Sequence, residues 1–317
     1  MTVTDFIKGN DNFILIPHRN PDGDCLGSVT ALAYAIRSMG KTAYVSLPNE
    51  PAQRLAYLWN ESLRTPEDFS ADACITVDVA SPDMLGDMRC VFEEINESGK
   101  TACIDHHATN GGFAQVNCVD ANAAAAGEIV FELIKDKLAC PLTKNICENL
   151  YSAIASDTGC FRYSNTTPKT HRIAALLMET GINSSAIIKR LFETTTMESL
   201  SVSAELINGA RFFEDGRICV MTADAEMLKR HGMTFDDVDE FAALPRTIDG
   251  VEIGVFLKVK STDEVKISLR SNAYADVSKM AAELGGGGHA RAAGVTIHGT
   301  RDEALGAILA EAKKHLK

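Results

Sequence analysis

Residues 13–40 read FILIPHRNPDGDCLGSVTALAYAIRSMG, and this stretch decides the fold of the first half of the chain. It opens with an apolar run at 13–17 that is too short for a helix and predicts a buried strand. A helix is predicted next, because its apolar residues fall on one face: Leu26, Val29, Leu32, Ala33 and Ile36. Gly40 can end that helix in the left-handed conformation. Residues 13–40 therefore predict a strand followed by a helix.

The same alternation continues along the first half. Apolar runs at 42–47, 74–78 and 101–105 predict further buried strands. Helical patterns cover about 124–138 and 144–155, and a later helix has Thr167 as N-cap, Pro168 as its first residue and Gly181 just past its end. Strands that alternate with helices predict a parallel sheet with helices on both faces.

The pattern changes after Gly181. Residues 184–210 are mostly helical, and strands are expected at 217–221, 251–260, 264–270 and 293–298, with the middle two joined as a hairpin through 261–263. Helices are expected at 276–284 and from Asp302 onward. The fold class is therefore α/β: a parallel-sheet domain at 1–185, a helical linker at 186–215 and a smaller α/β domain at 216–317.

Composition limits the class of function. A chain of 317 residues fits two domains, and a net charge of −12 is poorly suited to gripping long nucleic acid through many phosphates. A small anionic substrate remains compatible, because bound divalent ions can invert the local field. Nine cysteines without a regular framework, no leader-like N-terminus and no stretch of about 20 apolar residues predict a cytoplasmic protein with no membrane segment.

Side chains that bind metal ions follow the predicted strands or a helix end. Because ligands of an open parallel sheet bind outside the carboxyl ends of its strands, we expect these groups to share one edge. The candidates are His18, Asp22 and Asp24 after the first strand, Asp78 at the end of the third, Asp105, His106 and His107 at the end of the fourth, and Asp157 after the helix at 144–155.

Aspartate and imidazole ligands without thiolate suit a hard or borderline divalent ion such as Mn²⁺. More ligands are present than one ion with an open position needs, which predicts two ions that clamp the attacking and leaving oxygens of a displacement. Asp78 stands alone on its strand end and is the expected bridge between them. The predicted metal ligands are His18, Asp22, Asp24, Asp78, His106 and Asp157.

Each motif also has a plainer reading. HxxxDxD is a common turn composition, a strand-ending Asp78 is often the N-cap of the next helix, and a lone His pair is weak evidence. Cys25 and Cys160 lie beside candidate ligands, but free cysteines are more often buried fillers. The four groups together, each at the same predicted edge, favour the metal site.

The second domain contains GGGGH at 285–289, which predicts a loop whose backbone N–H groups close around an anion. An arginine beside it could bind a phosphate with two hydrogen bonds. The alternative is a flexible linker. The predicted substrate-binding residues are Arg270, Ser271, Gly286, Gly287, Gly288, His289 and Arg291.

These motifs resemble a known family. HRNPDGDCLGS, ITVDVAS, IDHHATN and SAIASDTGCF resemble, in order and spacing, the four motifs of the DHH phosphoesterases, and SLRSN followed by GGGGHARAAG resembles the associated DHHA1 domain. A two-domain chain of this length is similar to the NrnA type, oligoribonucleases that also remove the 3′-phosphate from pAp. The resemblance implies a hydrolase that acts on short RNA or DNA oligonucleotides and on pAp, does not bind long duplexes, and forms a homodimer.

The resemblance also implies roles for single residues. His18, Asp22 and Asp78 would hold one ion, and the other would be held by Asp24, Asp78, His106 and Asp157. His107 would contact the scissile phosphate, with Asp105 orienting a histidine of its own motif. Arg270, the glycines and His289 would receive the substrate's other phosphate or its terminal nucleotide.

One departure and several alternatives remain. Family members often carry a Ser-Thr pair where this chain has alanines at 123–126, which puts fine substrate preference in doubt. Relatives include RecJ-type single-strand exonucleases, cyclic-dinucleotide phosphodiesterases and pyrophosphatases. A non-catalytic nucleotide sensor is the alternative from another class, and its expected signature is the loss of a metal ligand.

Overall fold

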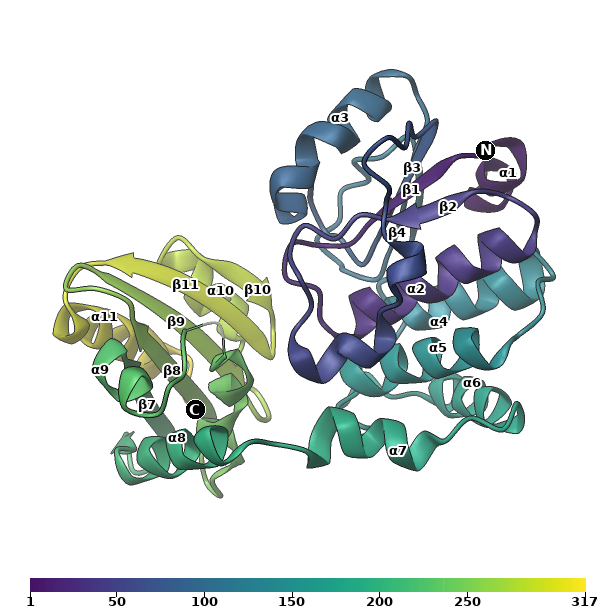
Figure 1. The fold of residues 1–317 in the computed structure, drawn as a ribbon. Coiled ribbons are helices and arrows are strands. Elements are labelled where there is room, and N and C mark those ends of the chain that lie inside the picture. The colour runs from purple at the N-terminus through teal and green to yellow at the C-terminus, as the bar shows by residue number, and fades with distance from the viewer. Residues whose placement is uncertain (236) are drawn as a thin grey trace. The chain divides into compact units, whose positions relative to one another are not determined.

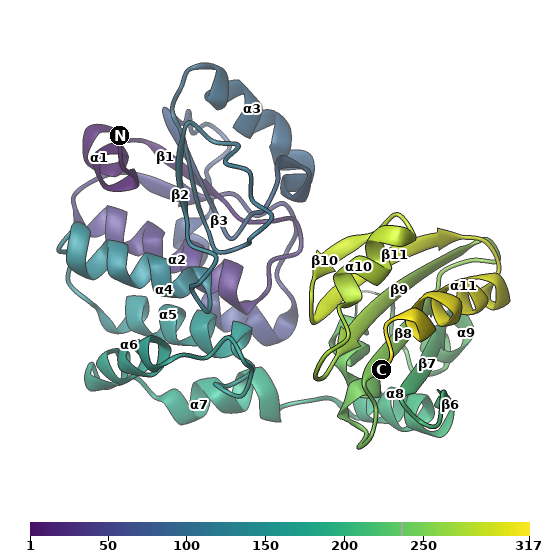
Figure 2. The ribbon, with the colours of Figure 1, turned by 180° about the vertical axis from the view of Figure 1, so that it is seen from behind.

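The computed structural model describes residues 1–235 and 237–317, with His289 described by its backbone alone. The chain divides into two compact units, Met1–Thr194 and Thr195–Lys317, each with its own sheet. The division falls inside the stretch that the sequence predicts as a linker. Figures 1 and 2 show the two units from opposite sides.

The sheet of the first unit is parallel throughout, in the order β2-β1-β3-β4-β5. Its strands are β1 (Phe13–Ile16), β2 (Ala43–Val45), β3 (Ala73–Val77), β4 (Thr101–Asp105) and β5 (Val116–Val119). The parallel sheet and its first four strands confirm the prediction. The edge strand β5 was not predicted, because only one residue of VNCV is fully buried and the apolar signal is correspondingly weak.

Helices cover both faces of this sheet, as predicted. Phe13 and Leu15 point into one core, and Ile14 and Ile16 point into the other, as strand alternation requires. One face is covered by α1 (Val3–Gly9), α2 (Gly23–Ser38) and α4 (Ala126–Glu132) with its π-helical turn η4 (Leu133–Lys137), and α5 (Lys144–Asp157) packs behind them on α2 and α4. The opposite face carries η3 (Pro82–Met88) and α3 (Arg89–Glu97) (Figure 1).

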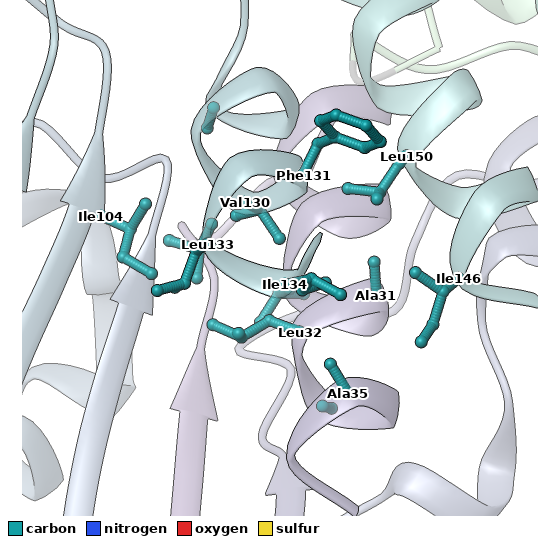
Figure 3. Packing of buried hydrophobic residues seen from close by; sticks show 14 of the residues in the cluster. Ala31, Leu32, Ala35, Ile104, Val130, Phe131, Leu133, Ile134, Ile146 and Leu150 are labelled. Carbon is teal, nitrogen blue, oxygen red and sulfur yellow. The ribbon is translucent and has the colours of Figure 1, made fainter. Parts of the chain in front are cut away.

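The packing of α2, α4 and α5 forms the larger core. Figure 3 shows Leu32 of α2 and Val130 and Leu133 of the α4–η4 segment gathered toward Ile104 of β4, with Leu150 of α5 beside Phe131. These helices carry two of the candidate metal ligands, so their packing also fixes the positions of those ligands.

The remaining elements of the first unit are short, apart from α6 (Pro168–Glu179). Thr167 caps α6, Pro168 is its first residue and Gly181 follows it with φ +80°, as predicted. The others are η1 (Gln53–Leu58), η2 (Glu61–Leu63), α7 (Ser184–Ile188) and η5 (Lys189–Glu193).

The second unit has a mixed sheet in the order β10-β11-β9-β8-β7-β6. Its strands are β6 (Arg211–Phe213), β7 (Ile218–Asp224), β8 (Ile253–Val259), β9 (Glu264–Ser271), β10 (Gly287–His289) and β11 (Ala292–His298). The predicted β8–β9 hairpin is antiparallel. One face packs on α10 (Val277–Glu283) and α11 (Arg301–Lys314), and the other packs on α8 (Met197–Asn208), α9 (Ala225–Arg230) and η6 (Asp239–Thr247).

The stretch 186–215 is shared between the two units. Ile187 of α7 belongs to the core of the first unit, whereas Val202 and Leu206 of α8 belong to a core of the second. Among residues 1–235 and 237–317, no helix combines the length and the apolar character needed to cross a membrane.

Candidate active site

Asp78 lies at the centre of the candidate metal ligands. It follows β3 directly and has φ +59°, a left-handed conformation that turns the chain sharply at the end of the strand. It caps no helix, since Ser81 precedes η3. Its Oδ1 atom is buried and has no hydrogen-bond partner among the described residues.

Two histidines reach the same carboxylate. The Nε2 atom of His106 and the Nδ1 atom of His107 each lie 3.5 Å from Asp78 Oδ1. On the other side, His18 Nε2 lies 3.9 Å from Asp78 Oδ2. Asp78 therefore belongs to two groups of potential metal ligands at once.

His106 links Asp78 to two further carboxylates. Its Nε2 atom lies 3.5 Å from Asp157 Oδ2 and 3.8 Å from Asp24 Oδ2. Its Nδ1 atom lies 3.3 Å from the Ala123 carbonyl oxygen, which can only accept, so Nδ1 carries the proton and Nε2 faces the carboxylates. Asp24, His106 and Asp157 thus form a third potential ligand group.

Asp24 is completely buried at the start of α2. Its Oδ2 accepts a hydrogen bond from Ala126 N at 2.7 Å, and its Oδ1 accepts from Gly127 N and the Ser28 hydroxyl, both at 3.0 Å. Burial first, and then the charges of Asp78 and Asp157, raise the pKa of Asp24 well above its ordinary value. A carboxylate that is buried and lies near two other carboxylates is stabilised in its charged form by a bound cation.

Asp105 holds His107 and is not one of the clustered ligands. Its Oδ1 accepts from His107 Nδ1 at 2.7 Å and from His106 N at 2.8 Å, and its Oδ2 accepts from the Asn110 amide at 2.7 Å. Burial alone would lower the pKa of His107, but the hydrogen bond to Asp105 and the nearby charge of Asp78 outweigh it and raise the pKa. Sequence reasoning overlooked Asn110, the last residue of the IDHHATN stretch.

Asp22 and Cys25 lie at the start of α2, and only Cys25 falls in one of the close ligand groups of the described residues. Asp22 is exposed and caps α2, with its Oδ1 accepting from Asp24 N and Cys25 N at 3.0 Å each. Cys25 falls in one ligand group with His18 and Asp78. Burial, followed by the charges of Asp78 and Asp22, raises the pKa of the Cys25 thiol, and a protonated thiol is a poor metal ligand.

The cluster fits a pair of divalent cations. Metal–ligand bonds of about 2 Å place two ligands of one ion at most about 4 Å apart, and the separations around Asp78 and His106 lie between 3.5 and 3.9 Å. The oxygen and imidazole donors suit a hard or borderline ion. The unpartnered Asp78 Oδ1 supports the same conclusion, because a buried oxygen without a partner is otherwise destabilising.

The alanines at 123–126 contribute through their backbone. Ala123 orients His106, Ala126 N binds Asp24, and Asn165 donates to the carbonyl oxygens of both Ala124 and Asp157. These contacts use only backbone atoms of residues 123–126, so the side chains of that stretch carry no signal for them. They hold His106, Asp24 and Asp157 in place through backbone groups of this stretch.

The second unit brings its predicted residues together, but the glycines form no loop. Gly287 and Gly288 belong to the edge strand β10, paired antiparallel with Gly294 and Ala293 of β11. The N–H of Gly286 donates to the Ala281 carbonyl oxygen at 2.7 Å, so it is not available to an anion. The predicted loop is wrong for Gly287–His289, which form an edge strand, and binding of an anion by this stretch stays a prediction.

Packing also explains why these positions are glycine. A Cβ atom at Gly286 would lie 2.2 Å from the Gly294 carbonyl oxygen, and one at Gly288 would lie 2.6 Å from the Ala292 oxygen. Ala292 pairs with Arg270 on its other side. Arg291 donates to the Ala275 carbonyl oxygen at 2.8 Å and to the Ser271 hydroxyl at 3.3 Å. These two hydrogen bonds connect Arg291 with the end of β9 and with the segment before α10.

Comparisons with known proteins agree with this architecture. Residues 12–154 match the DHH family N-terminal domain and residues 215–317 match the DHHA1 domain. The bifunctional oligoribonuclease and PAP phosphatase NrnA of Thermus thermophilus is 31% identical, over 99% of this chain and 93% of its own. Its namesake in Bacillus subtilis is 25% identical over 91% of this chain and 90% of its own.

A solved structure shares the whole fold. The exopolyphosphatase-related protein from Bacteroides fragilis superposes with a TM-score of 0.87 at 23% identity, covering 98% of this chain and 94% of that one. The parallel sheet, the acidic and histidine cluster at its carboxyl edge and the second sheet define a DHH-type phosphoesterase. The chain therefore belongs to the DHH/DHHA1 family of phosphoesterases, and within it to the NrnA type. Hydrolysis of phosphoester bonds is the activity of this class.

Proposed function

We propose that this protein hydrolyses the phosphoester bonds of short RNA or DNA oligonucleotides and removes the 3′-phosphate of pAp, with two divalent ions, Mn²⁺ being the proposed metal. The observation that carries the metal part is the position of Asp78, whose two oxygens face separate ligand groups. The names of the Thermus thermophilus and Bacillus subtilis relatives support the substrates. The net charge of −12 supports short substrates over long duplexes.

We assign the ions to the residues as follows. His18 and Asp78 would hold one, with Asp22 assigned to the same ion from its sequence motif alone, and Asp24, Asp78, His106 and Asp157 would hold the other. When bound, such ions polarise the phosphoryl group and activate water for attack. Ala123 would then orient His106 toward the ions. Asp24 would hold the start of α4 beside them.

His107 is the proposed contact to the scissile phosphate. Its Nδ1 proton is held by Asp105, which leaves Nε2 as the nitrogen that can meet a substrate oxygen. Its raised pKa favours the protonated imidazolium, which donates a hydrogen bond to an anionic phosphate. Asp105 is thus proposed to position His107 and to keep it protonated.

The second unit is proposed to bind the rest of the substrate. Arg270, Ser271, His289 and the glycine strand are the candidates, with Arg291 bracing Ser271. Arg270→Ala should raise KM and leave the metal affinity unchanged. Loss of bound metal in Arg270→Ala would contradict this role. Arg301→Ala, an exposed arginine on α11, is the matched control.

The decisive assay measures Mn²⁺-dependent hydrolysis of labelled RNA from dinucleotide to pentamer, with pAp in parallel. Release of mononucleotides and of phosphate from pAp, both lost in Asp78→Asn, is the expected result. Inertness on both substrates with turnover of a cyclic dinucleotide or a long single strand would retain the metal site and reject the substrates.

The cytoplasmic location and the homodimeric state of this protein are proposals too. All nine cysteines are free thiols, which supports a reducing cytoplasm. The homodimer rests on the family resemblance alone. Sedimentation of the full chain tests it, and a monomer at micromolar concentration would reject it.

A further inference from the structure

The first unit contains a cavity that the metal cluster does not use. Its volume is about 390 Å³, within the range of roughly 300–1,000 Å³ found for small-molecule sites. It is lined by residues of η1, of the first half of α5 and of the α7–η5 segment. None of the candidate metal ligands is among its described lining residues.

Three aromatic rings line this cavity: Tyr34, Tyr57 and Trp59. Tyr57 is held in place by its hydroxyl, which donates to the Ser152 hydroxyl at 3.1 Å. Trp59 is held by its indole N–H, which donates to Glu61 at 2.8 Å. Rings fixed in this way give a planar ligand a stacking surface, and stacking of a base on an aromatic ring is worth about 1–3 kcal/mol.

Carboxamides form the polar part of the lining. Asn149 is 7% exposed and donates to the Asn145 carbonyl oxygen at 2.9 Å, and its own Oδ1 is buried away from the cavity surface. A carboxamide offers a donor and an acceptor side by side, as the edge of a nucleobase does. The oxygens of Asn60 and Asn183 already accept from Ser62 N and Ala186 N, so these two residues offer their amide N–H groups. The carboxamides that line the cavity are Asn60, Asn145, Asn149 and Asn183.

The charges in the lining are balanced. Arg190 and Glu148 are its only charged residues among those described. The Arg190 guanidinium lies over the Tyr57 ring, 5.0 Å from its centre, and the Arg64 guanidinium lies over the Trp59 ring at 5.6 Å, so a cation occupies one face of each ring. One cation against one anion does not suit a ligand with several phosphates. This balance of charge suits a planar ligand of low charge with many hydrogen-bond donors and acceptors.

We propose that this cavity is a nucleobase-binding site of the first unit, separate from the metal cluster. The aromatic rings and the carboxamides gathered in one lining are the features that carry the proposal. Asn149 precedes Asp157 by eight residues on α5, which is about 12 Å along a helix. The base could belong to a free nucleoside or mononucleotide, or to a nucleotide of a bound oligonucleotide.

Trp59 reports on the cavity directly, since it is the only tryptophan of the 317 residues. The full chain is titrated in EDTA with adenosine and with cytidine, and its tryptophan fluorescence is excited at the red edge of the absorption band, where nucleosides do not absorb. A saturable change with a nucleoside, and none with ribose 5-phosphate, is expected. The absence of a saturable change with either nucleoside, or an equal response to ribose 5-phosphate, would overturn the proposal.

Two exposed lining residues and a matched control complete the test. Arg190→Ala and Asn145→Ala should each weaken nucleoside binding by about fivefold or more, as expected for a lost polar contact. Lys189→Ala changes the exposed neighbour of Arg190 in η5, which does not line the cavity, and should bind normally. Unchanged binding in both lining variants would place the fluorescence response elsewhere and reject the site.

A trinucleotide with phosphorothioate linkages, also in EDTA, distinguishes the two sources of the base. Binding tighter than that of the nucleoside, and weakened by Arg190→Ala, assigns the cavity to a base of the oligonucleotide. Affinity equal to that of the nucleoside assigns it to free nucleosides or mononucleotides. These binding measurements need no turnover, so they succeed or fail independently of the proposed hydrolysis.

Discussion

Asp78 combines two destabilising features at one residue. A left-handed backbone costs about 1–2 kcal/mol for a residue with a side chain, and Asp78 has φ +59°. Its Oδ1 atom is buried without a hydrogen bond, and the nearest cationic groups, His106 Nε2 and His107 Nδ1, lie 3.5 Å away, so its loss of water is only partly compensated. Strain of this kind is found at functional sites, where it orients a reactive group.

Asp78→Asn separates the metal role of this residue from its place in the fold. Asparagine tolerates the left-handed region and fills the same volume, so the melting temperature in EDTA should be equal or higher. Hydrolysis should fall by at least about a hundredfold, because even outer-shell partners of metal ligands contribute 10–100-fold. Asp87→Asn, at an exposed position in η3, should leave both quantities unchanged. Near-normal activity in Asp78→Asn would contradict the shared-ligand assignment.

Asp105→Asn should act through His107. The variant keeps the shape of the side chain but loses the charge that raises the pKa of His107. We expect kcat to fall by about 10–100-fold, with a normal Mn²⁺-induced rise in melting temperature, because Asp105 belongs to none of the ligand groups. A variant that no longer binds metal would make Asp105 a ligand and refute this role.

Close packing between helices sets the distances in the metal cluster. A Cβ atom at Gly27 of α2 would lie 2.5 Å from the Asn149 carbonyl oxygen of α5, and that contact is with backbone, which cannot swing away. Asp24 lies on α2 and Asp157 ends α5. Gly27 therefore permits the helix spacing that lets both carboxylates reach His106.

Gly27→Ala should force α2 and α5 apart. We expect a loss of about 1–3 kcal/mol in the free energy of unfolding, as for other overpacked sites, together with weaker Mn²⁺ binding. Gly306→Ala is the control, since Gly306 lies within α11 with nothing within 4 Å of its Cβ position. That change should stabilise the chain by up to about 1 kcal/mol. Denaturant unfolding and metal titration measure both, and normal metal affinity in Gly27→Ala would refute the link.

The charge balance of the first unit depends on pH. Burial, together with the charges of Asp22 and Asp78, raises the pKa of Asp157 to about 7. Burial opposes protonation of His106, but the contact with Asp78 and the charges of Asp24 and Asp157 raise its pKa to about 10. For both groups the folded value exceeds the unfolded one, so their stabilising contribution is present at low pH and lost as pH rises through the folded pKa.

Without metal, the first unit should therefore lose stability between about pH 5 and pH 8. Mn²⁺ replaces the protons of the cluster, so the melting temperature should rise more on adding Mn²⁺ near pH 8 than near pH 5. Calorimetry of the full chain in EDTA and in Mn²⁺ measures this difference. Asp157→Asn should reduce it, and an equal shift at both pH values in the unsubstituted chain would contradict the prediction.

The sequence alone determined most of the first unit. Its strands are short apolar runs and its helices are amphipathic, so periodicity predicts the parallel sheet, and the positions after the strands predict its carboxyl edge. Thr167, Pro168 and Gly181 located α6 because capping is local chemistry. Local signals of this kind are present in the chain before it folds.

Only the tertiary structure decided which groups meet. His106 meets Asp24 and Asp157, and Ala123 orients it, through contacts between segments far apart in the chain. The glycines at 285–288 looked like a loop because their spacing carries no information about a partner strand. Pairing with β11 is a long-range contact, so β10 exists only once the second sheet has formed.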